Sequence, residues 1–432
     1  MAQDATNDDM HAFSLDGMEL GVATAATQIE GGNADTNWHH WADEPGRVAD
    51  GSTPARAVDH WNRVAQDIDL LRELGVKHYR MGLEWARLEP SPNQFDDAAF
   101  DHYADELTRL QDAGITPLVT LHHFNNPWWF EQTGGFTTRD SIDVFEQYTR
   151  EVLTRLGPLA QDWITINEPN VYANGGYIDG NMPPGHHSMT EGLRVMQVLA
   201  EAHIRGYLAI HEIRPDARVG VANHLRVFRP ANPWNPLNQV ASKLSQYLFQ
   251  DALSKAMNTG RFPLPFHQPK GVKPGRYYDF QGINYYSRST VTGLGDGTTP
   301  GVPINDLGWE IYPEGLAILA RHVNKLYPGP IYITENGTAD AADAFRPLFL
   351  YDHIKAAAQS GAPVERFYHW CFTDNWEWSD GEGPRFGLIA LDYETQQRTP
   401  RDSAYFYTDI AANGGVTEDA YQRWVAGLEY PR

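Results

Sequence analysis

The sequence is poor in cysteine and in lysine. Its 432 residues include one cysteine, Cys371, which excludes an internal disulfide and a zinc site made of several cysteines. Only 7 of the 34 basic residues are lysine, against 33 aspartates, and the formal net charge is −22. Nucleic acid and anionic membranes would repel such a chain, so we expect neither as a main partner. An acidic, lysine-poor surface suits high salt, and an arginine-biased composition explains it equally well.

Targeting and membrane signals are also missing. The chain opens with MAQDATNDDM, which has neither the basic start nor the apolar run of a secretory signal. No stretch approaches the roughly 18 uninterrupted apolar residues that a membrane-spanning helix requires. We therefore expect a cytoplasmic protein in which residues 1–12 form a flexible tail. The composition is compatible with both a monomer and a homo-oligomer.

Apolar residues are plentiful, at 41% of the chain with 12% aromatic, which is ample for a large buried core. The chain has no low-complexity linker and no short repeat, so we predict a single domain over residues 1–432. Short β-prone runs alternate with longer segments of helical periodicity. The eight runs span residues 19–25, 78–85, 116–123, 162–167, 218–224, 279–286, 331–334 and 367–373.

Amphipathic segments lie between these runs, and glycine ends several of them before the next run, as in RELGV and QDAGI. The apolar stripes are Val64, Ile68, Leu71 and Leu74; Phe100, Tyr103, Leu107 and Leu110; Leu193, Met196, Ala200, His203 and Tyr207; and Leu316, Leu319 and Val323. Eight alternating units predict an α/β fold, a single (β/α)8 TIM barrel. A doubly wound sheet fits less well, because no glycine-rich phosphate turn follows the first run. Residues 292–306, rich in Gly, Pro and Thr, are interpreted as a long surface loop.

Polar side chains gather where the predicted strands end, which is where such a barrel carries its chemistry. The endings are His122-His123, Asn167-Glu168, Asn284-Tyr285-Tyr286, Thr334-Glu335-Asn336 and Trp370. Glu168 precedes Pro169, so we expect an extended backbone there. Glu168 and Glu335 should face each other across the barrel mouth. Two carboxyl groups across a cleft lined by Trp and Asn suit cleavage of a glycosidic bond.

These motifs resemble those of glycoside hydrolase family 1, the β-glucosidase family. The matching pieces are VATAATQIEG, HYRMGLEW, LHHFNNPWWF, TINEPN, GINYY, YITENG and DNWEW with RFGL, which together span nearly the whole chain. NEP and TENG alone would be weak evidence, but the full set occurs in order at the expected barrel positions. The chain departs from the family pattern in MELG before VATAA, in Phe124 after His123, and in its short length between the fifth and sixth strands.

The resemblance implies a role for each matching residue. Glu168 would be the acid/base and Glu335 the nucleophile of a retaining β-glycosidase. The partners of these two carboxyl groups would be Arg80, Asn284 and Tyr286. The residues that would hold the terminal sugar are Gln28, His123, Asn167, Trp370, Glu377 and Trp378. The implied substrate is a small β-glycoside or oligosaccharide, and no cofactor or metal is implied.

Elementary electrostatics makes a prediction for the two carboxyl groups. Arg80 and the Tyr286 hydroxyl should lower the pKa of Glu335, and the negative charge of Glu335 should raise the pKa of Glu168. In that case Glu168 would be protonated in the resting enzyme. The paired histidines, such as His122-His123, do not suggest a metal site, because neighbours on a strand point to opposite faces.

Two other functions stay open at this point. A family member could transfer its sugar to an alcohol or a second sugar instead of water, and a barrel could bind sugar without cleaving it. The presence of both Glu168 and Glu335 argues against the second, because binding alone needs no proton donor opposite a nucleophile. The sequence does not separate glucose from galactose or fucose, since Gln28 and Glu377 can serve either configuration at C4.

Overall fold

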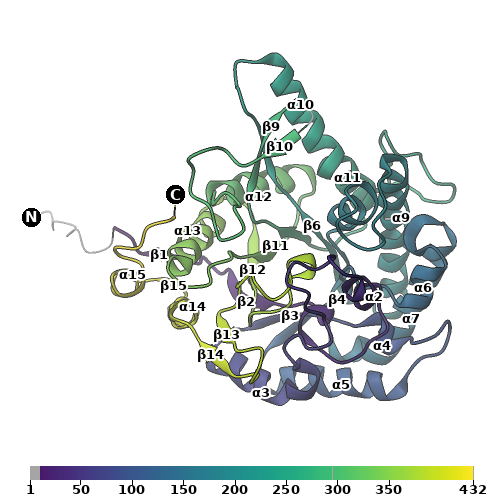
Figure 1. The fold of residues 1–432 in the computed structure, drawn as a ribbon, viewed down its shortest axis with the longest axis horizontal. Helices are drawn as coiled ribbons and strands as arrows, with labels where there is room; N and C mark the ends of the chain where they lie inside the picture. The colour runs from purple at the N-terminus through teal and green to yellow at the C-terminus, as the bar shows by residue number, and fades with distance from the viewer. Residues whose placement is uncertain (1–9, 294, 432) are drawn as a thin grey trace, which may run out of the picture.

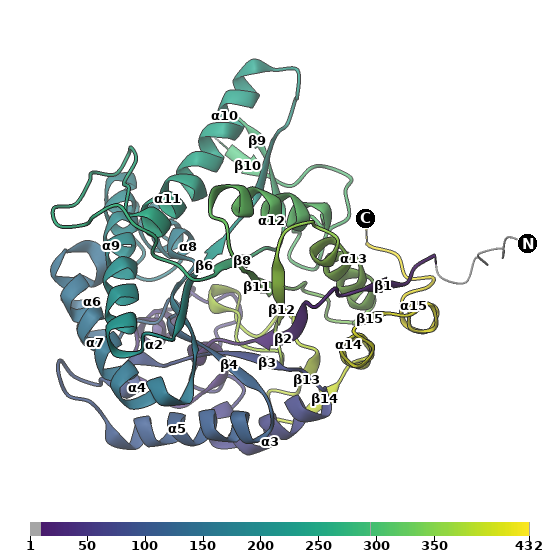
Figure 2. The same ribbon diagram turned by 180° about the vertical axis from the view of Figure 1, so that it is seen from behind.

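The computed structural model describes residues 10–293 and 295–431, and its centre is a closed barrel of eight strands (Figures 1 and 2). In chain order the barrel strands are β2 (Glu19–Ala23), β3 (His78–Gly82), β4 (Thr116–His122), β5 (Asp162–Asn167), β6 (Arg218–His224), β8 (Gln281–Asn284), β11 (Ile331–Asn336) and β12 (Val364–Trp370). All pairs within the barrel are parallel, and β12 pairs with β2 to close it. The predicted (β/α)8 barrel is confirmed.

All eight predicted runs overlap a barrel strand, and the differences are at the ends. The seventh strand runs on to Asn336, and the eighth begins at Val364 instead of residue 367. The side chains of β3 and β5 are buried along their whole length. A parallel strand is covered by helices on one side and by the barrel interior on the other, so both faces are buried, although β3 carries His78 and Arg80.

Helices surround the barrel on the outside (Figures 1 and 2). The longer ones are α3 (His60–Glu73), α5 (Asp97–Asp112), α7 (Asp140–Leu156), α9 (Met189–Ile213), α11 (Ala252–Thr259), α12 (Glu314–Leu326), α13 (Arg346–Ala358) and α14 (Asp402–Asn413). Each predicted apolar stripe falls on one of them, namely α3, α5, α9 and α12. Most residues of these stripes are buried, so the helices cover the barrel as their periodicity predicts.

Shorter elements fill the connections. The helical ones are α1 (Ala26–Ile29), α2 (Asn37–Asp43), α4 (Trp85–Leu88), α6 (Trp128–Gln132), η2 (Gly135–Thr137), η3 (Gly157–Leu159), α8 (Pro169–Ala173), η4 (Asn174–Ile178), η6 (Trp378–Asp380) and α15 (Glu418–Trp424). The strands are β13 (Ile389–Leu391), which pairs with β14 (Arg398–Pro400), and β1 (Phe13–Ser14), which pairs with β15 (Gly415–Val416). None of the described helices is long and apolar enough to cross a membrane.

The interpretation of residues 292–306 as a surface loop is wrong in its first part. Strand β9 (Arg288–Thr292) turns back into β10 (Gly295–Gly297), and β9 also pairs with β7 (Val227–Pro230). Every residue of β10 is exposed and two of the three are glycine. A strand without buried side chains leaves no periodic signal, so composition alone suggested a loop.

This small sheet belongs to an arm that stands away from the barrel (Figures 1 and 2). The arm also contains α10 (Pro236–Gln246), which continues through η5 (Tyr247–Asp251) into α11. Exposed apolar side chains mark its surface, from Trp234, which is 91% exposed, to Leu237 and Val240. Because β7 follows β6 and β9 follows β8 in the chain, the arm forms a wall above the carboxyl ends of β6 and β8.

The first nine residues of the predicted tail lie outside the described residues. Within residues 10–12, His11 is held by hydrogen bonds to residues far along the chain. Its backbone N–H donates to Glu418 at 3.0 Å, and its carbonyl accepts the Tyr351 hydroxyl at 2.9 Å.

Candidate active site

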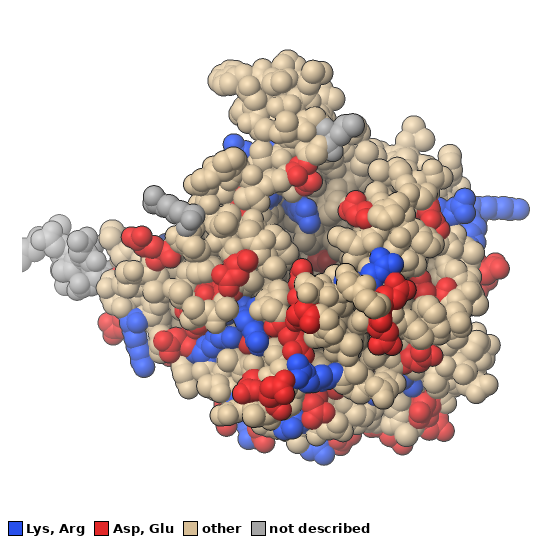
Figure 3. Space-filling view, in the orientation of Figure 1, with Lys and Arg blue, Asp and Glu red and all other residues tan. Residues whose placement is uncertain are grey.

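A cavity of about 620 Å³ opens at the carboxyl ends of the barrel strands, and the face of the molecule is hollowed there (Figure 3). Seven of the eleven predicted site residues line it: His123, Glu168, Tyr286, Glu335, Trp370, Glu377 and Trp378. The other four each hydrogen bond to one of these: Gln28 to Glu377, Arg80 to Glu335, Asn167 to His123, and Asn284 to Glu168. The structure therefore brings all eleven together.

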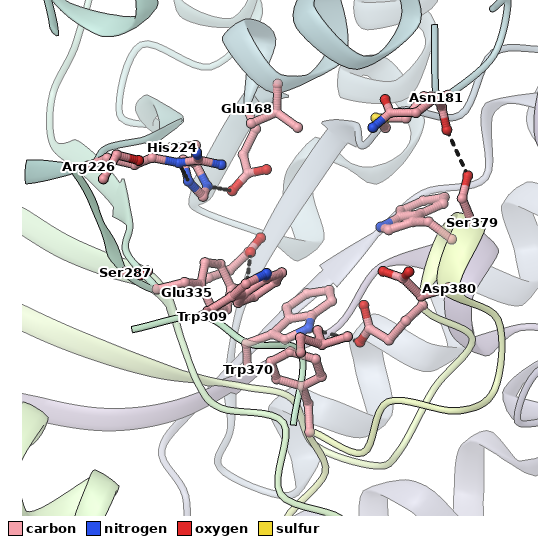
Figure 4. A pocket seen from close by; sticks show the side chains of 18 of the residues that line it. Glu168, Asn181, His224, Arg226, Ser287, Trp309, Glu335, Trp370, Ser379 and Asp380 are labelled. Atoms are coloured by element: carbon pink, nitrogen blue, oxygen red, sulfur yellow. Dashed lines mark hydrogen bonds and ion pairs between the residues drawn. The ribbon is translucent and has the colours of Figure 1, made fainter. Parts of the chain in front are cut away.

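Glu335, on β11, is held by a cation and a hydroxyl. Arg80 Nη1 lies 2.5 Å from Oε1, and the Tyr286 hydroxyl donates to Oε2 at 2.7 Å. Arg80 is fully buried in the barrel interior, so its charge is compensated there by this carboxyl group. Both oxygens of Glu335 are thus fixed in place at the floor of the cavity (Figure 4).

A chain of amides connects Glu335 with Glu168. Asn167 Oδ1 accepts from Arg80 Nη2 at 2.7 Å and from Asn284 Nδ2 at 3.0 Å. Asn284 Nδ2 also donates to Glu168 Oε1 at 2.9 Å. These partners come from β3, β5, β8 and β11, so closure of the barrel sets the relative position of the two carboxyl groups.

The backbone prediction for Glu168 is wrong. Its φ and ψ are +42° and +58°, in the left-handed region, although it precedes Pro169. The proline disfavours the right-handed helical region, and the left-handed turn lets the chain leave β5 and enter α8 without an extended residue between them. Glu168 still donates its backbone N–H to Ala222 on β6 at 2.7 Å. Such a conformation costs a non-glycine residue about 1–2 kcal/mol, which the strand and the helix on either side must offset.

The predicted order of the two pKa values is also reversed in the unliganded site. Burial raises the pKa of Glu335 to about 7, although Arg80 and the Tyr286 hydroxyl oppose it. Burial alone would also raise the pKa of Glu168, but His224, Asn284 and the charge of Arg80 together hold it below the ordinary carboxyl value. The sequence prediction included the cation and left out both His224 and the cost of burying Glu335. Because the two groups interact, they share their protons as a pair.

One side of the cavity is built from Gln28 and Glu377. Gln28 Nε2 donates to Trp376 O at 2.9 Å and lies 3.3 Å from Glu377 Oε2, while Gln28 Oε1 is buried without a partner among the described residues. Burial raises the pKa of Glu377 to about 8, and Trp370 Nε1 donates to its Oε1 at 3.2 Å. At neutral pH this side therefore offers a protonated carboxyl group and an open amide oxygen to a ligand.

His123 and two tryptophans make the adjoining surface. Asn167 Nδ2 lies 2.9 Å from His123 Nε2, and both hydrogen-bonding positions of Asn167 Oδ1 are already taken by donors, so His123 Nε2 accepts and Nδ1 carries the hydrogen. Burial, then the charge of Arg80, lower the pKa of His123 well below its usual value, which keeps the ring neutral. The rings of Trp370 and Trp378 lie tilted against it at 5.8 and 5.9 Å.

A family model described as "Glycosyl hydrolase family 1" matches residues 13–416. The chain belongs to glycosyl hydrolase family 1. Among its relatives, a protein named β-glucosidase A from Thermotoga maritima is 31% identical, with 93% of this chain and 98% of the relative covered. A β-galactosidase from Saccharolobus solfataricus is 28% identical over 95% of this chain and 97% of its own.

Solved structures of family 1 enzymes share this fold. A β-glucosidase from Thermotoga maritima in complex with glucoimidazole gives a TM-score of 0.86 at 31% identity, over 93% of this chain and 99% of the other. A β-glucosidase from Thermotoga maritima in complex with galacto-hydroximolactam gives a TM-score of 0.87, over 94% of this chain and 100% of the other. The fold therefore matches family 1 along nearly the whole chain.

Among the residues of this family 1 cavity that were not predicted are His224, Arg226 and Trp309. A signal for His224 was present, because it ends the fifth strand as the other site residues end theirs. Arg226 lies two residues beyond the end of β6, outside the predicted run 218–224, and Trp309 lies in a connection away from any barrel strand end. Among the described residues, no three His, Cys, Asp or Glu side chains come together as the ligands of a metal would.

Proposed function

We propose that this family 1 protein is a retaining β-glycosidase that removes terminal, non-reducing β-D-glucosyl residues, and β-D-galactosyl residues as well. The observation that carries the proposal is the placement of Glu335 and Glu168 on one hydrogen-bonded frame inside the cavity. The relatives named β-glucosidase and β-galactosidase support both sugars.

The proposed reaction has two displacements at the anomeric carbon. The carboxylate of Glu335 attacks that carbon while the carboxyl group of Glu168 gives its proton to the leaving oxygen, so the glycosidic bond breaks and a glycosyl ester forms. The charge of Glu335 is then absorbed in the ester. Glu168, now ionised, takes a proton from water, which attacks the same carbon and releases Glu335.

Arg80 and Tyr286 have a defined part in this cycle. Both donate to Glu335, and both favour its carboxylate, which is the attacking form in the first step and the leaving group in the second. The reactive form of the pair has one proton, and that proton is on Glu168. Trp370 offers the flat face on which the sugar ring packs.

The charges at the cavity support an unphosphorylated sugar. Asp380 lines it, and its carboxylate would repel a phosphate. Arg385, in the same loop, is 3.5 Å from Asp374 and donates to Leu391 O at 3.1 Å, so its charge is already engaged.

The experiment is hydrolysis of an aryl β-glucoside, with the first-formed anomer followed by proton NMR. β-Glucose as the first product is expected, and α-glucose would contradict retention. Release no faster than in buffer would favour a barrel that only binds sugar. Added methanol then measures transfer to an alcohol as methyl β-glucoside.

The roles of the two carboxyl groups are separated with Glu168→Ala. We expect this variant to keep a fast first step on substrates with excellent leaving groups, because they need no proton. Azide should then accelerate the second step and give the β-glycosyl azide. An α-glycosyl azide would show that the two roles are reversed.

A further inference from the structure

The acid/base carboxyl group has a neighbour that the family motifs do not include. His224, the last residue of β6, lies with its Nδ1 2.9 Å from Glu168 Oε1. Arg226 Nε donates to His224 Nε2 at 3.0 Å on the other side of the ring. Figure 4 shows the three side chains in line at the edge of the cavity.

The direction of these hydrogen bonds follows from the chemistry of arginine. A guanidinium group only donates, so His224 Nε2 must accept and cannot carry a hydrogen. The hydrogen of the neutral ring is therefore on Nδ1, and Nδ1 donates to Glu168. A second proton on the ring would place two donors, His224 Nε2 and Arg226 Nε, against each other. Arg226 thus selects the tautomer that serves Glu168.

Both partners are fixed by the surrounding structure. The backbone carbonyl of His224 accepts from Asn170 Nδ2 at 2.8 Å. The imidazole ring of His224 is stacked with the ring of Tyr286, with 6.0 Å between the two centroids. The Arg226 backbone N–H donates to Gln250 at 2.9 Å. The guanidinium group lies 5.2 Å from the ring centre of Phe249, on the arm.

We propose that His224 is a positioning residue for Glu168, and that Arg226 holds it in the tautomer that donates to Glu168 Oε1. This rests on the acid/base role proposed for Glu168. Asn284 donates to the same oxygen, so both N–H donors fall on Oε1. Oε2, which accepts from none of the described side chains, is left to carry the proton that goes to the leaving oxygen and later comes from water.

The consequence for protonation has a clear sign. A donor to a carboxylate stabilises the ionised form, so the His224 N–H keeps the pKa of Glu168 low together with Asn284 and Arg80. The other titratable groups that face Glu168 are Glu335 and Tyr286. Asp179 and Asp296 face Arg226, the latter at 3.7 Å, and partly balance its charge. Removing the N–H of His224 should therefore raise the pKa of Glu168.

The test compares the pH dependence of kcat/KM on an aryl β-glucoside for three forms of the protein. In His224→Phe the ring against Tyr286 is kept and the N–H is lost, so the basic limb of the carboxyl pair should move up, by less than the pKa of Glu168 itself. In His224→Asn an amide N–H takes the place of Nδ1, and the limb should coincide with that of the wild type. The limb reports loss of the one proton that the pair shares and that Glu168 must give.

Two more variants distinguish loss of the hydrogen bond between His224 and Glu168 from a general disturbance of the protein. In Arg226→Met the His224 ring can take either tautomer and a positive charge is lost. The basic limb of the pH profile should therefore move in the same direction as in His224→Phe. His211→Phe is the matched control, because His211 also bonds a carboxylate, Asp279 at 2.8 Å, on the outside of the barrel. Its limb should not move.

A direct titration keeps the proposal independent of turnover. The carboxyl carbon of Glu168, assigned with Glu168→Gln, is followed by carbon-13 NMR in wild type and His224→Phe, with circular dichroism to verify folding. A higher pKa in the variant supports the proposal, and equal values in two folded proteins overturn it. A wild type that does not hydrolyse β-glucosides would overturn the function proposed above, and the same titration would still decide whether His224 acts on Glu168.

Discussion

The floor of the cavity and its outer wall are built in different ways. The floor includes side chains of the barrel strands, such as Arg80, Asn167 and Glu335, and these are buried and joined by hydrogen bonds. The wall on the arm side consists of β7, β9 and β10, together with Trp309, and most of its residues are half-buried or exposed, with Ser289 and Val291 buried. Few charged side chains cover the projecting arm, whereas they are dense on the rest of that face (Figure 3).

Because they differ in this way, we expect the floor and the wall to have separate roles in substrate selection. A ligand hydroxyl that enters the floor meets fixed donors and acceptors, so a wrong sugar leaves buried polar groups unpaired at a cost of about 1–3 kcal/mol each. The outer wall offers aromatic and polar surface open to water, where one contact contributes less. The floor should therefore select the terminal sugar, and the wall should tune the group that leaves.

The largest effect is expected at the floor, from Glu335→Gln. The amide keeps the shape but cannot form the glycosyl ester, so kcat should fall on the order of 10⁵-fold for every β-glycoside. The measurement is release of an aryl group under saturating substrate. Glu201→Gln is the matched control, since Glu201 is also buried and pairs with an arginine, Arg139 at 2.6 Å, between outer helices. Activity in Glu335→Gln that depends on the aglycone would break the division between floor and wall.

The floor could be predicted from the sequence and the wall could not, for a physical reason. Asn167, Glu168 and Glu335 each lie at the end of a buried strand, so periodicity fixes where they lie in space once the barrel is assumed. Glu168 and Glu335 were found in this way, and His224 could have been. The wall comes largely from a hairpin on the arm, and its strand β10 has no buried residue that would leave a periodic signal. Trp309 and Arg226 reach the cavity only through tertiary packing.

The sequence did not predict correctly the pKa values of Glu168 and Glu335. Motifs identify which charges are near, but the pKa of Glu335 depends first on how completely water is excluded. That quantity is a property of the closed barrel. The His224 contact that lowers the pKa of Glu168 also depends on a neighbour 56 residues away in the chain.

The second prediction concerns Gln28→Leu. It removes the unpartnered amide oxygen and the donor that lies next to Glu377, so kcat/KM should fall about 10–100-fold. Because the floor contacts only the terminal sugar, the factor should be the same for aryl glucosides and for cello-oligosaccharides. Gln281→Leu is the control: Gln281 is a buried glutamine at the opposite end of the barrel, bonded to Asn258. It should stay within about twofold of the wild type.

The third prediction is the basic limb of the pH profile. Since burial raises the pKa of Glu335 to about 7, the carboxyl pair keeps its one shared proton below that pH and loses it above. Glu168 then has no proton to give, and kcat/KM should fall about tenfold for each further pH unit. The limb belongs to the floor, so it should lie at the same pH for every aglycone. A limb that moved with the aglycone would show that the wall takes part in proton transfer.

A smaller effect is expected at the wall, from Trp309→Ala. The ring of Trp309 lies 5.7 Å from that of Tyr286 and lines the cavity, so its loss should cost about 1 kcal/mol of aglycone binding. kcat/KM should drop about fivefold for aryl glucosides and remain unchanged for glucosyl fluoride, which has no aglycone ring. Trp234→Ala, at an exposed tryptophan on the arm, should change neither. An equal loss on both substrates would place Trp309 with the floor.

The smallest effect is expected from the far side of the arm. Leu237 and Val240 are 76% and 64% exposed on α10 and do not line the cavity. Replacing both with serine should leave kcat/KM unchanged for every substrate, and the free energy of unfolding should shift by no more than about 0.5 kcal/mol per site. The two measurements are the substrate panel used for Trp309→Ala and a urea titration. If the double variant changed kcat/KM for aryl glucosides but not for glucosyl fluoride, the outer wall would have to include α10 itself, because only a shift of the whole arm could carry such an effect to β9 and β10.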